Sequence, residues 1–144
     1  MGLLEKQIFI KKSRIPNAGK GLFTRQSIPK GTRIIEYKGR ITTWEKVLQT
    51  DVFNGYVFYI NRNHVIDAKP CLASLARFAN DAKGFNKIKG MVNNSKFVKE
   101  DLKVFITSTK DIPAGAEIFV SYKKEYWDVL KFNNKLALKQ KKFN

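Results

Sequence analysis

The sequence has 144 residues, and its 28 Lys and Arg side chains outnumber its 12 Asp and Glu side chains, which gives a net charge of +16. This length predicts a single domain over residues 1–144, and a hydrophobic fraction of 43% excludes a disordered chain. The single cysteine, Cys71, excludes an internal disulfide and a zinc cluster of several cysteines, so we expect no bound metal. We find no secretory signal and no apolar run near the about 20 residues that span a membrane. We therefore expect an intracellular protein with no membrane partner.

The positive charge bears on the partners of the protein. A surface this basic attracts polyanions, and the attraction weakens as the salt concentration rises. Lysines also keep proteins soluble, and composition does not separate that role from nucleic-acid binding. The charge therefore describes partners and not chemistry.

Short segments rich in β-branched and aromatic residues recur along the chain and predict a mainly β fold. Asn-Arg-Asn at 61–63 lies between two of them and predicts a hairpin turn, because Asn tolerates a positive φ. In chain order the predicted strands are Ile8–Ile10, Ile34–Tyr37, Tyr56–Ile60, His64–Asp67, Lys96–Val98, Leu102–Thr107 and Glu117–Tyr122.

Two helices are predicted among these strands. The first covers 43–48, where Thr42 and Glu45 have the spacing of a capping box. The second runs from about Tyr126 to Lys139, in a basic C-terminal segment or tail at 128–144.

Two segments echo each other, SIPKGTRIIEY at 27–37 and DIPAGAEIFVSY at 111–122. Each has Pro at the second and Gly at the fourth position of a tight turn that leads into an apolar strand. They predict one turn-and-strand device used twice. The stretch 83–94, which mixes Gly, Asn and Lys, predicts an exposed loop.

Four segments stand out along the chain: NAGKGLF at 17–23, IIEYKGRI at 34–41, HVIDA at 64–68 with ARFANDA at 76–82, and AGAEIFVSYKKEYW at 114–127. In this order and at this spacing, they resemble the SET domain of protein-lysine methyltransferases. The resemblance covers about residues 6–127 and is closest to the short stand-alone SET proteins of the viral minimal type. It implies a β-clip-like fold of several small sheets, with a pseudoknot that brings the segments around Asn80 and Tyr122 to one site.

The resemblance implies S-adenosylmethionine as the cofactor and the transfer of its methyl group to a lysine side chain of a protein. Asn80 matches the Asn that binds the cofactor's ammonium, and Asp81 stands where relatives have His, which changes the charge beside the adenine. Gly19 and Gly21 lack a Cβ, so the backbone can approach a ligand closely. The further implied cofactor contacts are Lys20, Leu22, Tyr56, Arg77, Phe78, Tyr122 and Trp127.

Tyr122 is implied to be the catalytic residue. The reaction needs a neutral amine, whereas a free lysine has a pKa of about 10.4. A narrow apolar channel disfavours the charged amine, and a fixed phenol then aligns it with the methyl group. By resemblance Tyr37, Val120 and Tyr126 line this channel. Val120 replaces a frequent Phe or Tyr, so we expect room for di- or trimethylation, and we expect Tyr59 in the core.

Two other functions fit parts of the sequence. A small basic β-barrel that binds RNA or DNA would use the charge and the interleaved aromatic residues. A SET-like module could also bind cofactor or peptide without turnover. A +16 enzyme repels basic histone tails unless acidic side chains gather at its groove, so a lysine-containing substrate of either histone-like or ribosomal type stays open. We hypothesise a substrate associated with DNA or ribosomes, with nucleic-acid contact through the basic surface. We expect a location in the cytoplasm or on nucleoid or chromatin; secretion into a host and a homodimer stay open.

Overall fold

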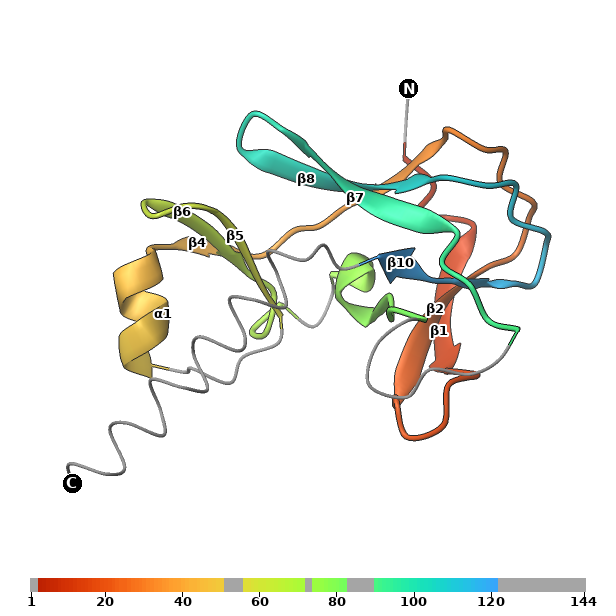
Figure 1. Ribbon diagram of the computed structural model, residues 1–144, viewed down its shortest axis with the longest axis horizontal. Helices are drawn as coiled ribbons and strands as arrows, with labels where there is room; N and C mark the ends of the chain where they lie inside the picture. Colours follow the sequence, from red (N-terminus) through yellow and green to blue (C-terminus); the bar gives the residue numbers. More distant parts are fainter. Residues whose placement is uncertain (1–2, 51–55, 72–73, 83–89, 122–144) are drawn as a thin grey trace. The chain divides into compact units, whose positions relative to one another are not determined.

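The computed structural model describes residues 3–50, 56–71, 74–82 and 90–121 (Figure 1). In these residues the protein is mainly β, as predicted, and its strands form three small sheets accompanied by a short α-helix and a 3-10 helix. The chain divides into two compact units. The first unit holds the described residues up to Tyr37 and from 74 to Ser121, and the second holds those from Lys38 to 71.

The first sheet of the first unit is built on a hairpin. Strands β1 (Ile8–Lys12) and β2 (Lys20–Thr24) pair antiparallel, and β9 (Glu117–Ile118) pairs antiparallel with the other edge of β2. Every residue of β2 after Lys20 is buried. The central strand of this sheet is therefore covered on both faces, and it carries the first of the motif segments into the core.

The second sheet of the first unit has the strand order β10-β7-β8-β3. Strand β10 runs parallel to β7, whereas the other two pairings are antiparallel. The 3-10 helix η1 (Leu75–Phe78) packs against β1, β2 and β3. The bounds of the strands are Val120–Ser121 for β10, Ser95–Glu100 for β7, Lys103–Ser108 for β8 and Arg33–Glu36 for β3.

The core of the first unit consists mainly of aliphatic side chains from these strands and their turns. Fully burying one such side chain stabilises a fold by roughly 1.5–3 kcal/mol. The members with 1% exposure or less include Leu22, Phe23, Ile28, Ile34, Val104, Ile106, Ile112, Ile118 and Val120.

The two similar turn segments lie against each other. Ile28 and Ile112 form an antiparallel bridge in which each N–H donates to the other's carbonyl at 2.8 Å. Gly31 and Gly115 both have φ +83°, a left-handed conformation that L side chains rarely adopt. The repeated motif is therefore a pair of turns that face each other and start β3 and β9.

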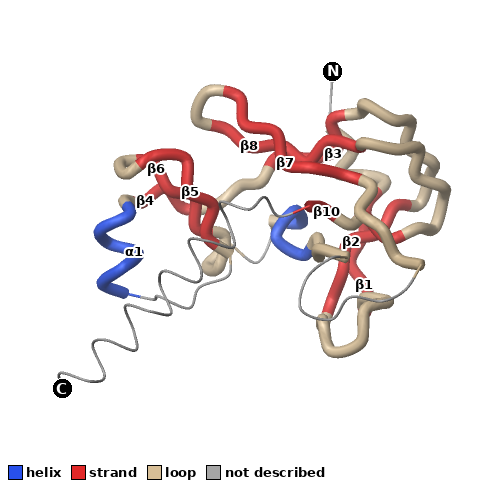
Figure 2. Tube along the Cα trace, viewed as in Figure 1, coloured by secondary structure: helices blue, strands red, loops and turns tan. Residues whose placement is uncertain are grey.

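The second unit contains the three-stranded sheet β4-β6-β5 and helix α1 (Trp44–Thr50) (Figure 2). The helix buries Val47 against Val57 and Val65, and Trp44 packs on the same cluster. The strand bounds are Arg40–Thr42 for β4, Val57–Asn61 for β5 and His64–Asp67 for β6. In the described part of the chain, neither helix has the length and apolarity needed to cross a bilayer.

Six of the seven predicted strands are present in the described residues with bounds close to those expected, and the first predicted helix is present as α1. The segment predicted as one strand, Glu117–Tyr122, instead forms two short strands, β9 and β10, that belong to different sheets, and Tyr122 lies outside the described residues. Two strands were not predicted. Strand β2 has no polar alternation because both of its faces are covered, and β4 is three residues long with two exposed side chains. The predicted helix at 126–139 lies outside the described residues.

Two local predictions need correction. Thr43, and not Thr42, caps α1, because its Oγ1 accepts the Lys46 N–H at 3.3 Å while Thr42 pairs within the sheet. The turn at 61–63 is present, but without a positive φ: the Asn63 N–H donates to Asn61 Oδ1 at 2.9 Å. The Asn side chain, and not a left-handed backbone, makes this turn.

The prediction that Tyr59 is a core residue is wrong. Its side chain is 40% exposed, and its ring meets Trp44 edge-on with centroids 5.3 Å apart. Val57 and Tyr59 lie on the same face of β5, because side chains two residues apart in a strand point the same way. Val57 is buried in the cluster of the second unit, whereas Tyr59 packs on Trp44 at the outside of that cluster.

Replacing Gly115 by Ala should lower the free energy of unfolding by about 1–2 kcal/mol, because a Cβ opposes the left-handed backbone. Space is not the cause, since nothing lies within 4 Å of the Cβ position. Gly115→Asn should therefore cost less, because Asn tolerates this conformation. Urea unfolding of the three proteins measures the difference; equal losses for Ala and Asn would refute a conformational origin.

Candidate active site

In the first unit, the peptide group between Phe119 and Val120 is hydrogen-bonded on both sides. The Val120 N–H donates to the Asn80 carbonyl at 2.9 Å. On the other side, the Phe119 carbonyl accepts the N–H groups of Asn94 and Ser95, both at 3.0 Å. The strand that leads to position 122 is thereby held between the segment after η1 and the start of β7.

Asn80 also joins this strand to Gly19, Lys20 and Gly21, at the start of β2. We call these three residues the GKG turn. Its Nδ2 donates to the Lys20 carbonyl at 3.1 Å. No described residue donates a hydrogen bond to its Oδ1, which is therefore a ready acceptor for a ligand. Asn80 thus brings together two of the motif segments, one from β2 and one from η1.

The GKG turn and the Leu22 that follows it contain residues in different environments. Gly19 is exposed, has φ +71° and has nothing within 4 Å of its Cβ position, so its backbone is open to a ligand. Lys20 is exposed as well. Gly21 and Leu22 are buried, and the Leu22 side chain has no exposed surface. Only the backbone of Leu22 is therefore suited to a ligand contact.

Gly21 is required by a buried carboxylate. A Cβ at this position would lie 2.3 Å from Glu117 Oε2. Glu117 is 1% exposed; its Oε2 accepts the Ser13 hydroxyl at 2.7 Å and its Oε1 accepts the Arg14 N–H at 2.9 Å. The close-approach explanation drawn from the sequence therefore applies to Gly19, whereas at Gly21 the missing Cβ makes room for Glu117.

Two consecutive asparagines hold the site from the other side. Asn94 Nδ2 donates to the Glu117 carbonyl at 3.0 Å, and its Oδ1 accepts the Phe119 N–H at 3.0 Å. Asn93 Nδ2 donates to Asp81 Oδ1 at 2.9 Å, and its Oδ1 accepts the Ala82 N–H at 2.8 Å. The carboxylate of Asp81 is therefore held within the protein.

Sequence reasoning missed Glu117, Ser13 and Asn93 as residues that position the site. A signal existed for Glu117, since it is the one charged residue in the apolar strand EIFV. Its partner in the turn, Gly21, gave no signal of the pairing, because a glycine has several structural uses.

The remaining predicted residues lie in the first unit, in the second unit or outside the described residues. Tyr37 and Val120 are 6% and 0% exposed in the first unit, and the Tyr37 ring meets Phe97 edge-on with centroids 5.7 Å apart. Arg77 and Phe78, at the end of η1, are half-buried, with the guanidinium 5.0 Å from the ring centroid. Tyr56 belongs to the second unit. The positions Tyr122, Tyr126 and Trp127 lie outside the described residues.

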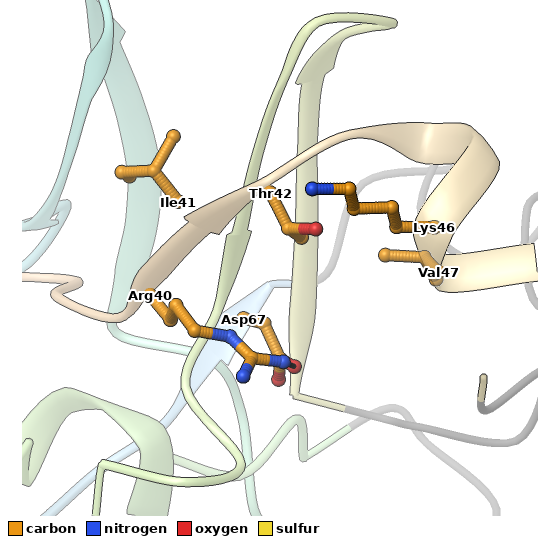
Figure 3. A pocket seen from close by; sticks show the side chains of 6 residues that line it. All are labelled: Arg40, Ile41, Thr42, Lys46, Val47 and Asp67. Carbon is orange, nitrogen blue, oxygen red and sulfur yellow. Dashed lines mark ion pairs between the residues drawn. The ribbon is translucent and has the colours of Figure 1, made fainter.

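The second unit has a pocket of about 260 Å³ beside β4 and α1 (Figure 3). Arg40 extends toward Asp67, with Nη2 3.7 Å from Oδ2, and Lys46 reaches from α1 toward Thr42. The described residues that line it include none of the predicted site residues. This pocket and the Asn80 site are therefore built from different parts of the chain.

The model of the SET domain family matches residues 19–123, which include both the GKG turn and the Asn80 segment. This chain belongs to the SET-domain family. The match also includes Glu117, Asn93 and Asn94, whereas Ser13, which bonds to Glu117, precedes the matched range.

Several larger SET-domain proteins are similar to this chain. It is 32% identical over 130 residues, 86% of its length, to Histone-lysine N-methyltransferase 2D of Homo sapiens. Over 128 residues, 81% of its length, it is 30% identical to the Variant-silencing SET domain-containing protein of Plasmodium falciparum and 27% identical to Histone-lysine N-methyltransferase EZH2 of Chaetomium thermophilum. The chain spans only 2%, 5% and 8% of the lengths of these three relatives.

The contact between Gly21 and Glu117 predicts energetic coupling. Gly21→Ala alone should lower the free energy of unfolding by about 1–3 kcal/mol through overpacking. Glu117→Ala alone should cost about 1–3 kcal/mol, because the Ser13 hydroxyl and the Arg14 N–H lose their acceptor. In the double variant the clash is absent, so the loss should fall short of the sum by about 1 kcal/mol or more.

Gly19→Ala is the matched control for this cycle. It introduces the same methyl group two residues away, where nothing lies within 4 Å. Its loss should add to that of Glu117→Ala within about 0.5 kcal/mol. Urea unfolding measures all five variants, and a fully additive Gly21 cycle would show that the carboxylate does not determine this glycine.

Asn94→Ala should lower the free energy of unfolding by about 2 kcal/mol, because it removes two hydrogen bonds to the 117–119 backbone. Asn63→Ala is the control: in that exposed turn the backbone N–H of Asn63, and not its side chain, makes the bond to Asn61. The control should change stability by less than about 0.5 kcal/mol. Equal losses in thermal or urea unfolding would contradict the clamping role of Asn94.

Proposed function

We propose that this SET-domain protein transfers a methyl group from S-adenosylmethionine to the side-chain amine of a lysine in another protein. The main support for the proposal is a pair of hydrogen bonds at Asn80. Its side chain donates to the Lys20 carbonyl, and its own carbonyl accepts the Val120 N–H. We call this pair of bonds the Asn80 joint. The joint ties the GKG turn to the strand that leads to Tyr122. Membership of the SET family, and two relatives named as histone-lysine methyltransferases, support the same reaction.

The residues around Asn80 fit the proposed cofactor. When bound, S-adenosylmethionine supplies a methyl group on a positively charged sulfonium. Asn80 Oδ1 suits the cofactor's ammonium as an acceptor, and the exposed backbone at Gly19 allows close approach. The other residues proposed to hold the cofactor are Lys20, Gly21, Leu22, Tyr56, Arg77, Phe78, Asp81, Tyr122 and Trp127.

We assign Tyr122, which directly follows β10, the role of aligning the acceptor amine. Tyr37, Val120 and Tyr126 are proposed to wall the channel through which the lysine enters. The burial of Tyr37 and Val120 supports a dry, apolar wall, and such surroundings favour the neutral amine that the reaction needs. A valine leaves more room than an aromatic residue, so we propose that more than one methyl group can be added.

We propose a lysine-containing protein as the substrate, held on DNA or on a ribosome. A free basic tail is repelled by a net charge of +16, whereas a nucleic-acid scaffold screens that repulsion. We accordingly propose that the protein is located in the cytoplasm or on nucleoid or chromatin.

Tyr122→Phe should lower the rate of methyl transfer about 100-fold or more, because the hydroxyl that orients the amine is lost. Transfer of labelled methyl from S-adenosylmethionine to nucleosomes and to ribosomes measures the rate, and mass spectrometry locates the lysine and counts its methyl groups. Tyr59→Phe is the control. It removes the same hydroxyl from a tyrosine that is 40% exposed and packs on Trp44, and transfer should be unchanged.

A thermal shift with S-adenosylmethionine separates this function from the alternatives. The cofactor should stabilise the protein, and Asn80→Ala should abolish most of the shift, because the joint with Lys20 is lost. Stabilisation without transfer to any acceptor would indicate a binding module. Absence of both would contradict the proposed enzyme.

A further inference from the structure

The β1–β2 hairpin carries several cations, and only Lys20 among them has a role in the proposed reaction. Residues 6–25 contain six Lys and Arg side chains and no Asp or Glu, and we name this segment the cationic hairpin. All six side chains are exposed. Among the residues that the structure describes, none of the six forms an ion pair; the ion pairs found are Arg33–Glu100 and Arg40–Asp67. The six are Lys6, Lys11, Lys12, Arg14, Lys20 and Arg25.

The register of the hairpin brings like charges together. Lys12 lies directly opposite Lys20, and Lys11 lies next to this pair, opposite Gly21. Like charges placed directly across an antiparallel pair destabilise it. Glu117 does not offset them at the surface, because its carboxylate is buried and bonded to Ser13 and Arg14.

Protection of a sheet edge explains only part of this arrangement. Strand β1 is an edge strand, and lysines on an edge discourage pairing with other chains. However, Lys20 starts the central strand β2, Arg14 lies in the turn, and Arg25 follows β2. The turn, with cations on both of its arms, lies at the lower end of β1 and β2 in Figure 1. An external polyanion is the partner that would relieve this repulsion.

The aromatic rings of the hairpin distinguish among polyanionic partners. Phe9 and Phe23 stack with centroids 5.8 Å apart; Arg25 lies over Phe9 at 4.5 Å, and Lys11 lies over Phe23 at 4.6 Å. Each ring is thus covered by a cation, and the pair presents no large exposed apolar surface for insertion into a lipid layer. The large exposed hydrophobic residues of the described chain are elsewhere, at Ile41, Tyr59, Val92 and Leu102.

We propose that the cationic hairpin binds the phosphate backbone of a nucleic acid without reading its sequence. Phosphate contacts by Lys and Arg supply such binding, and they give an affinity that falls steeply with salt. Of the six cations, only Lys20 is shared with the residues proposed to hold the cofactor. The surface would hold the protein beside a substrate that sits on the same nucleic acid. Binding through the hairpin does not require methyl transfer.

The test compares two triple variants with the same change in charge. One carries Lys11→Gln, Lys12→Gln and Arg14→Gln in the cationic hairpin; the other carries Lys96→Gln, Lys99→Gln and Lys103→Gln in the β7–β8 hairpin, where all three side chains are also exposed. Fluorescence anisotropy with a labelled duplex of about 20 base pairs gives the affinity as a function of salt. Urea unfolding shows that both variants are folded, and neither measurement requires cofactor.

The first variant should lose three phosphate contacts, which lowers the slope of log affinity against log salt by about 2.7. Between 50 and 200 mM salt, this removes an about 40-fold change in affinity. The β7–β8 variant should keep the slope of the unaltered protein. Equal losses in both variants would overturn the proposal in favour of diffuse charge. Equally tight binding to polyglutamate, or to vesicles with anionic lipid, would overturn nucleic acid as the partner.

Discussion

The first unit depends on the peptide group between Phe119 and Val120. Its N–H and its carbonyl point to opposite sides, and each finds backbone partners there, at Asn80 on one side and at Asn94 and Ser95 on the other. Leaving a buried backbone group without a partner costs about 1–3 kcal/mol, so neither side can move away freely. The segment after η1, the start of β7 and the end of the 117–121 strand are consequently fixed relative to one another. The geometry of the GKG turn follows from the same joint, because Asn80 also binds Lys20.

The buried carboxylate of Glu117 extends this constraint to the N-terminal hairpin. It accepts hydrogen bonds from Ser13 and Arg14, and its Oε2 occupies the space that Gly21 leaves. Burial of a charged group is costly unless hydrogen bonds satisfy it, and here the turn between β1 and β2 provides them. The turn thus provides the hydrogen bonds that allow Glu117 to be buried, and Glu117 in turn accounts for the glycine at position 21.

Much of the fold could be predicted from the sequence, because many of its strands are short runs of β-branched and aromatic residues between turn residues. Strand β6 matched its predicted bounds at both ends. Strand β2 was missed for a physical reason, since a strand covered on both faces shows no alternation. The cap of α1 was misplaced by one residue, because Thr42 and Thr43 have the same side chain and only the sheet pairing of Thr42 decides between them.

The order of the motifs predicted which segments form the candidate site, but not the residues that hold these segments in position. The resemblance identified Asn80 and the GKG turn, and the structure brings these two together. It gave no indication of the roles of Asn93 and Ser13, because a polar residue in a turn has many uses and its partner is distant in sequence. Ser13 and Glu117 are 104 residues apart, and local patterns carry no information on such a contact.

That separation also governs how the protein is made. A ribosome synthesises Ser13 and Arg14 long before it reaches Glu117, so their hydrogen bonds to its carboxylate can form only late in synthesis. Contacts between such distant residues close slowly, since the chain must first lose the entropy of a large loop. Strands β9 and β10 therefore complete the first unit, and the GKG turn gains its contacts with Glu117 and with the Asn80–Val120 bond only after synthesis has passed this segment.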